Sequence, residues 1–137
     1  MKAEQNRFTQ THDAAGVLLT VIDSTTGLEW TAKPLSDDYI TQQAATDAAT
    51  GCRVGGHEDW TLPSRQQLLT LVDLTRYSPA IDTDAFPDFP SSWFWTSDLA
   101  AWSSASAWGV DFGDGLVGYG GRRGFNGFAL AVRRAGQ

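Results

Sequence analysis

Cysteine and positive charge are both scarce in this sequence. Cys52 is the only cysteine, so no disulfide can form within the chain. Lys and Arg together number 10 against 16 Asp and Glu, which gives a formal net charge of −6. Because a general nucleic-acid binder needs a basic stripe, this balance argues against direct nucleic-acid binding and permits a basic partner.

Long apolar runs are also missing. No run reaches the length of a membrane span, and the polar N-terminus is unlike a signal peptide. We expect no membrane insertion. If the chain is complete, we expect a cytoplasmic protein, and if it is a fragment of a longer adhesin, we expect secretion or display at the cell surface.

Motifs for catalysis and metal binding are lacking as well. The serines within 103–106 have no Gly-x-Ser-x-Gly elbow around them. Cys52 lies in no identifiable electropositive setting, and its simplest interpretation is a small buried hydrophobe. His12 and His57 have no cysteine partners for a zinc site. We therefore expect no enzyme activity and no cofactor.

Five aspartates raise the question of calcium, because hard cations prefer clustered oxygens. No spacing matches an EF-hand loop, so turn aspartates are the favoured interpretation and no metal is predicted. Calcium binding in these loops stays open as an alternative. The five residues are Asp82, Asp84, Asp88, Asp111 and Asp114.

Glycine and tryptophan are abundant, with 14 and 6 residues, which is typical of a turn-rich sheet packed by large aromatics. A length of 137 residues fits one domain with a core of its own. We expect residues 1–16 to form a flexible N-terminal segment and residues 17–137 a single domain. Four tryptophans are expected to pack in the core: Trp30, Trp60, Trp95 and Trp108.

The first half of the chain predicts a hairpin and two helices. Residues 17–31 alternate as two strands around a turn at Gly27. Alanine spacing predicts a helix over 39–50, and a leucine stripe predicts another over 65–74.

The junction between these helices is sharply specified. Gly55-Gly56 marks a turn. Trp60 and Leu62 alternate like a strand with one buried face, so we expect Trp60 to be largely buried. Ser64 and Gln67 have the spacing of a capping box, which starts the second helix.

The last third of the chain predicts antiparallel strands. Residues 93–97 form one, and residues 107–112 and 116–119 form a hairpin around Gly113-Asp114-Gly115. A loop rich in Gly and Arg follows at 120–127, and a last strand is predicted over 128–132. Together with residues 17–31, these strands are expected to make one mainly antiparallel sheet.

Several of these elements stand in the order of a known family. The motifs are Asp23-x-x-x-Gly27-Leu28-x-Trp30, Gly56-x-x-Asp59-Trp60-x-Leu62-Pro63-Ser64, Trp95-Thr96-Ser97, Ala107-Trp108-x-Val110-x-Phe112 and Ala131-Val132-Arg133. Over residues 17–134 the chain resembles the bacterial DUF1566 domain, of the type found at the C-terminus of a Legionella collagen-like adhesin. The resemblance implies an α+β, C-type-lectin-like fold with two helices packed on a twisted, mainly antiparallel sheet. The calcium-dependent sugar motifs Glu-Pro-Asn and Trp-Asn-Asp of animal lectins are absent.

The favoured hypothesis is a non-enzymatic binding module. It would present loops 98–106 and 114–127 to a glycan, sulfated ones included, or to a protein. Arginines in a glycine-rich loop suit planar recognition of sulfate, phosphate or carboxylate, and a tryptophan beside a turn can stack on a sugar. A solvated loop with scattered ion pairs is the simpler alternative. The predicted ligand-binding residues are Trp102, Arg122, Arg123, Phe125 and Asn126.

A second hypothesis comes from a different class of protein. A small, acidic, phage-encoded cytoplasmic inhibitor would block a host defence or nucleic-acid-handling complex through its acidic surface. The predicted acidic residues are Glu58, Asp59, Asp82, Asp84 and Asp88.

Overall fold

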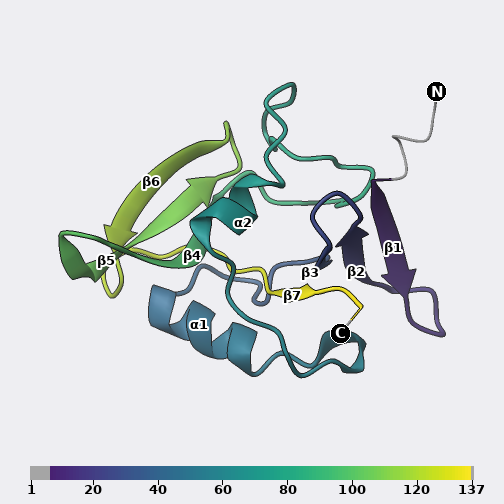
Figure 1. Cartoon of the computed structure of the whole chain (residues 1–137). Coiled ribbons are helices and arrows are strands. Elements are labelled where there is room, and N and C mark those ends of the chain that lie inside the picture. Colours follow the sequence, from purple (N-terminus) through teal and green to yellow (C-terminus); the bar gives the residue numbers. More distant parts are fainter. Residues whose placement is uncertain (1–6, 137) are drawn as a thin grey trace.

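The computed structural model describes residues 7–136 and has an α+β fold, as the sequence predicts (Figure 1). Two antiparallel sheets are present, one of four strands in the order β1-β2-β3-β7 and one of three strands in the order β4-β5-β6. The elements are β1 (Phe8–His12), β2 (Leu18–Asp23), β3 (Leu28–Thr31), α1 (Gln42–Thr50), the short 3-10 helix η2 (Val54–Gly56), α2 (Arg65–Leu69), β4 (Trp93–Ala100), β5 (Ser103–Asp111), β6 (Leu116–Gly121) and β7 (Val132–Arg134).

The predicted N-terminal hairpin is confirmed. Strands β2 and β3 pair across the turn that starts at Asp23. The Asp23 carboxylate accepts hydrogen bonds from the Thr25 amide at 2.9 Å and the Thr26 hydroxyl at 3.1 Å. Gly27 then takes a φ of 76°, where a side chain would be strained.

The N-terminal segment differs from the prediction. Residues Phe8–His12 form β1, which pairs with β2, so a flexible segment over 1–16 is wrong for these residues. The ring of Phe8 packs edge-on against Phe86, with centroids 5.7 Å apart. β1 is an edge strand with few apolar residues, which explains why its sequence gave so weak a signal. Residues 1–6 lie outside the described residues.

Both helices are present but shorter than predicted. α1 begins after Thr41, whose hydroxyl accepts a hydrogen bond from the Ala44 amide at 3.2 Å. It cannot start at residue 39, because Ile40 forms a β-bridge with Gly127. α2 ends at Leu69 rather than residue 74, although its predicted capping box is confirmed.

Three glycines in and beside the three-stranded sheet make room for one tryptophan ring. Trp93 from β4 lies across the backbone of three neighbouring segments. A Cβ added at Gly109 or at Gly127 would lie 2.3 Å from its indole, and one at Gly118 would lie 3.1 Å away. Only glycine lets this large ring sit so close to the main chain. The predicted hairpin between β5 and β6 is confirmed.

The expected single sheet is replaced by two sheets that a connecting segment joins. The last strand does not cover 128–132, because β7 is Val132–Arg134. The extended chain before it bonds to both sheets. The Phe128 amide donates to the Trp93 carbonyl at 2.8 Å, and the Thr31 amide donates to the Ala131 carbonyl at 3.0 Å. One stretch of chain therefore fastens β4 to β3.

The core has two clusters. The larger surrounds Trp30, Phe86, Phe94, Phe112 and Leu130. The smaller joins α1 to Trp60 and Trp95 through small residues of the helix and the buried Cys52. Trp60 is only 2% exposed, as predicted, but its expected strand is reduced to one β-bridge between Thr61 and Val132.

Candidate functional site

The arginines of the predicted loop have different roles in the structure. Arg122 is half-buried and already engaged with the protein. Its Nε donates to Gln42 Oε1 at 2.8 Å, and its terminal nitrogens donate to the Ser104 carbonyl and to Gln43 Oε1, each at 3.2 Å. Arg122 thus fastens the loop to α1 and β5, a role that the sequence pattern did not suggest.

Arg123 is exposed and makes no hydrogen bond or ion pair with any other residue in the range 7–136. It lines a cleft of about 510 Å³ together with Arg122, Gln43, Ser104 and the glycines Gly121 and Gly124. The cleft therefore combines one unpaired guanidinium with an amide and a hydroxyl side chain. We call it the Arg123 cleft.

Phe125 anchors the same loop by packing against two tryptophans. Its ring packs edge-on against Trp93 and Trp95, with centroid distances of 5.4 and 6.0 Å, and 44% of the residue stays exposed. A Cβ at Gly120 would lie 2.7 Å from this ring. Asn126 is exposed. The Phe125 ring therefore anchors the loop to the sheet, and only part of it remains exposed to a ligand.

An exposed aromatic cluster lies beside the cleft. Trp102 and Tyr119 are 61% and 58% exposed, and Trp108 is half-buried beneath them. The three rings meet edge to face, with centroid separations between 5.1 and 5.8 Å. The Arg65 guanidinium lies 4.5 Å from the centre of the Trp108 ring. We call Trp102, Trp108 and Tyr119 the aromatic cluster.

The sequence pattern indicates this cluster only in part. Trp102 is a predicted ligand-binding residue, whereas the pattern predicts a core position for Trp108, which is half-buried, and gives no role to Tyr119. Trp108 and Tyr119 are cross-strand partners in β5 and β6. The signal that could have identified them is the hairpin register, because residues equidistant from the four-residue turn over 112–115 stand opposite each other.

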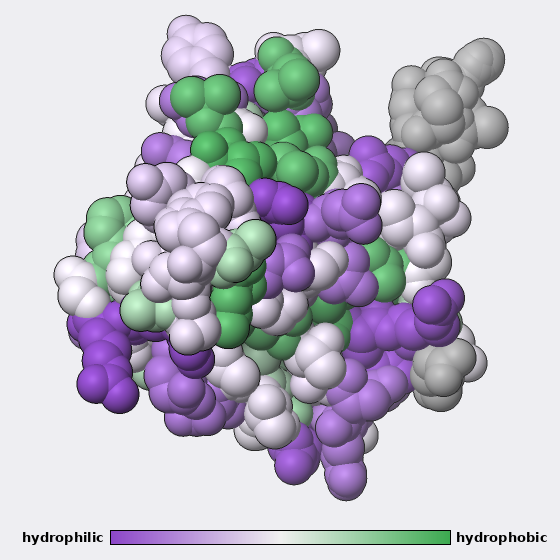
Figure 2. Space-filling model, turned by 60° about the vertical axis from the view of Figure 1, so that its left-hand side comes forward, coloured by the Kyte–Doolittle hydropathy of each residue, from purple (hydrophilic) through white to green (hydrophobic). Residues whose placement is uncertain are grey.

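The aromatic cluster and the Arg123 cleft adjoin along one ladder. Trp108 pairs with Tyr119, and two residues further along Ser106 pairs with Gly121, which lines the cleft. That step is about 7 Å along an antiparallel strand. Figure 2 turns the side that carries β5 and β6 forward, with hydrophobic side chains gathered in its upper part and hydrophilic ones below. Trp102 lies on the face of the sheet that carries Trp108 and Tyr119. Phe125 packs on the opposite face, against Trp93 and Trp95, because successive side chains of a strand alternate between the two faces.

The predicted acidic residues come from two separate segments. Glu58 and Asp59 follow η2, and the Asp59 carboxylate accepts a hydrogen bond from Arg133 at 2.6 Å. This bond holds the pKa of Asp59 below its usual value. Arg133 also pairs with the buried Glu29, so Asp59 is part of a structural ion-pair network.

The other three acidic residues lie in the long loop between α2 and β4. The Asp82 carboxylate accepts hydrogen bonds from the amides of Asp84 and Ala85 and lies 3.9 Å from Arg76. Asp84 and Asp88 are exposed. In the described part of the chain, no group of three or more His, Cys, Asp or Glu residues is arranged to hold a metal ion. None of the helices there is long and apolar enough to cross a membrane.

Comparisons with known proteins agree with the resemblance noted in the sequence. A comparison with curated proteins finds no match. The Lcl C-terminal domain, which is the DUF1566 family, matches residues 19–133. This range runs from β2 into β7 and includes the aromatic cluster and the Arg123 cleft. The chain therefore belongs to the Lcl C-terminal domain family.

Proposed function

We propose that this chain is a non-enzymatic, adhesin-like module that binds an acidic glycan across the aromatic cluster and the Arg123 cleft. Family membership supports a binding module in general. The observation that carries the glycan proposal is the exposure of two large aromatic residues on the same β5–β6 ladder as the cleft lined by Arg123. Exposed aromatic surface of this kind marks an interaction site rather than part of the core.

The aromatic cluster suits the apolar faces of sugar rings. Trp102 and Tyr119 are held edge to face, 5.1 Å between centroids, and both rest on Trp108. Their mutual packing restricts the rings before a ligand arrives, which lowers the entropy lost on binding. Rigid aromatics that are apolar on the face and polar at the tip are efficient contact residues.

The Arg123 cleft supplies the polar half of the site. Sugar hydroxyl groups would meet Gln43 and Ser104, and a sulfate or carboxylate substituent would meet the Arg123 guanidinium. A planar guanidinium makes paired hydrogen bonds to such groups. Arg122 contributes by fixing the loop rather than by direct contact.

Two single substitutions test this proposal by titration calorimetry with a heparin-derived oligosaccharide. We expect Trp102→Ala to weaken binding tenfold or more, about 1.4 kcal/mol. We expect Arg123→Gln to weaken binding and to reduce its salt dependence, because exposed charges are screened over about 10 Å at 0.1 M ionic strength. The control is Arg134→Gln, which removes an exposed arginine from β7.

Unchanged affinity in both variants would rule the proposal out. The acidic-inhibitor hypothesis predicts a different pattern in a host-protein pull-down. There, charge reversal of Asp82, Asp84 and Asp88 would abolish capture of a partner, and Trp102→Ala would leave it intact. That combined result would replace the glycan proposal.

A further inference from the structure

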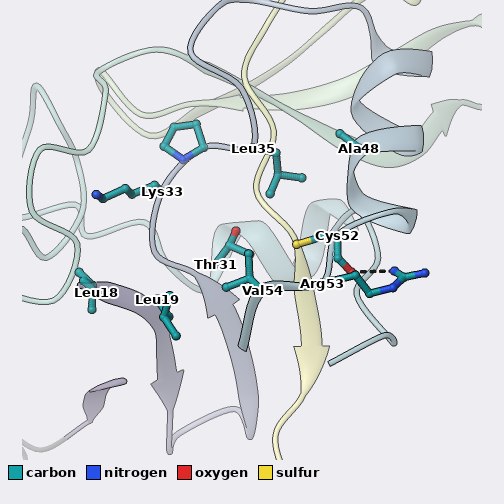
Figure 3. A pocket seen from close by; sticks show the side chains of 10 residues that line it. Leu18, Leu19, Thr31, Lys33, Leu35, Ala48, Cys52, Arg53 and Val54 are labelled. Carbon is teal, nitrogen blue, oxygen red and sulfur yellow. Dashed lines mark hydrogen bonds between the residues drawn. The ribbon is translucent and has the colours of Figure 1, made fainter. Parts of the chain in front are cut away.

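A second cavity lies apart from the proposed glycan site. It occupies about 340 Å³ between β2, β3, the chain that follows β3 and the C-terminal end of α1 (Figure 3). None of its lining residues belongs to the aromatic cluster or to the Arg123 cleft. We propose that this cavity binds the aliphatic chain of a small carboxylate, such as a medium-chain fatty acid.

The interior of the cavity is apolar. Leu19, Leu35 and Val54 line it from three different segments and are all only half-buried. The Cys52 side chain points toward Leu35 at the centre of the view in Figure 3. Partly exposed aliphatic side chains around one hollow gain free energy when another apolar group covers them. A hollow of this volume is at the small end of ligand pockets and suits one short chain.

The rim of the cavity is cationic. Lys33 and Arg53 are exposed and extend outward at opposite sides of the opening (Figure 3). No lining residue is acidic, and neither cation forms a salt bridge with any described residue. On a chain with a net charge of −6, two unpaired cations beside an apolar hollow favour a ligand with one anionic end.

The backbone holds one of these cations in place. Arg53 Nη1 donates to the carbonyls of Cys52 and Thr50, at 2.8 and 3.2 Å. These two hydrogen bonds hold the Arg53 guanidinium at the rim of the cavity. The Lys33 amine is a flexible point charge that can swing to meet a headgroup.

Calorimetric titration with decanoate at pH 7 tests the proposal. We expect saturable binding below the concentration at which decanoate forms micelles, and at least tenfold weaker binding of decanol, which has the same chain without the charge. The double variant Lys33→Gln with Arg53→Gln should lose at least tenfold in decanoate affinity. The matched control Arg123→Gln removes a cation elsewhere and should bind decanoate as the wild type does.

A second variant addresses the apolar part of the cavity. Ala48 lines the hollow from the half-buried face of α1, so Ala48→Leu should fill the space and keep the helix. We expect this variant to keep the wild-type melting temperature and to lose decanoate binding. Decanoate should also slow alkylation of Cys52 by iodoacetamide in the wild type.

Three results would contradict decanoate binding in this cavity. Absence of saturable decanoate binding would overturn the proposal. So would equal binding of decanoate and decanol, or decanoate binding that survives both Ala48→Leu and the double substitution. None of these results bears on heparin binding at the Arg123 cleft, so the two proposals can fail separately.

Discussion

The tryptophans of this chain include buried core residues and exposed surface residues. Substitution by alanine should distinguish the two groups by its effect on stability. Trp60 is 2% exposed, and its Nε1 donates to the Val54 carbonyl at 3.0 Å. Replacing it with Ala deletes a large core side chain, so we expect a loss of about 3–5 kcal/mol in the free energy of unfolding. Trp102→Ala removes a mainly exposed ring and should cost less than about 1 kcal/mol. Urea denaturation measures both, and an unchanged midpoint for Trp60→Ala would contradict its core position.

Substitutions of the neighbouring arginines Arg122 and Arg123 should also differ in their effect on the free energy of unfolding. Arg122→Ala leaves the amide oxygen of the buried Gln42 without its donor. We expect a loss of about 1–3 kcal/mol in the free energy of unfolding, the usual cost of an unpaired buried polar group. Arg123→Ala removes no hydrogen bond or ion pair within the described residues and should leave the melting temperature nearly unchanged. Differential scanning calorimetry of the two variants decides, and equal melting temperatures would show that Arg122 does not fasten the loop.

A site residue could be predicted from the sequence only where its neighbours along the chain indicate its role. Trp102 sits beside a turn with polar neighbours, so its exposure could be anticipated. Tyr119 depends on a partner across the hairpin, and Arg122 depends on Gln42, which is 80 residues away in sequence. The Arg122 contact spans too much sequence to leave a local signal, whereas the position of Tyr119 follows from the hairpin register.

At the scale of elements, the glycines under Trp93 are a packing requirement of the three-stranded sheet. Gly109→Ala would place a Cβ 2.3 Å from the Trp93 indole and 2.7 Å from the Phe94 carbonyl oxygen. We expect a loss of about 1–3 kcal/mol or more, because the indole must move out of a packed position. Gly121→Ala in β6 is the matched control, since a Cβ there meets nothing within 4 Å. Chemical denaturation compares them, and a stable Gly109→Ala variant would mean that Trp93 repacks freely.

Elements with strong local signals were predictable, and those defined by distant pairing were not. The capping box at Ser64 and the Gly27 turn depend on residues a few positions apart, and both are confirmed. The start of α1 depends on the bridge between Ile40 and Gly127, and β1 depends on β2. The split into two sheets follows from residues 127–131, whose apolar pattern does not specify which neighbours they join.

At the scale of the whole molecule, acid stability depends on carboxylates held ionised in the fold. Burial alone would raise the pKa of Asp23. Hydrogen bonds from Arg7, at 2.9 and 2.8 Å, and from the Thr25 amide outweigh this and hold its pKa below the usual value. A hydrogen bond from the Thr75 hydroxyl lowers the pKa of Asp73. A lowered pKa gives stability that is present above the unfolded-state pKa, about 3.9, and is lost as pH falls through the folded-state value.

We therefore expect the free energy of unfolding to fall steeply below about pH 4 in the wild type. Asp23→Asn should be less stable at pH 7, because Arg7 loses its partner, and should show a smaller further loss between pH 5 and pH 2. Asp84→Asn is the control, since that exposed carboxylate bonds to no described residue. Urea denaturation at stepped pH gives the slopes. Equal slopes for wild type and Asp23→Asn would mean that the Arg7 pair does not govern acid stability.

The chain as a whole is an α+β member of the Lcl C-terminal domain family. The C-type-lectin-like relationship stays a prediction from the family resemblance. The proposed glycan site lies where β5 and β6 meet the loop that Arg122 fastens. The buried tryptophans Trp30, Trp60 and Trp95 lie away from solvent, whereas Trp102 is exposed.

This contrast makes the six indole N–H signals the most direct test of the central proposal. A ¹H–¹⁵N NMR titration with a heparin-derived oligosaccharide reports on each tryptophan separately. We expect the indole signals of Trp102 and Trp108 to shift on binding and those of Trp30 and Trp60 to stay in place. The shifts should shrink in the Arg123→Gln variant. Saturable binding that leaves the Trp102 and Trp108 signals unmoved, or no binding at all, would contradict the proposal.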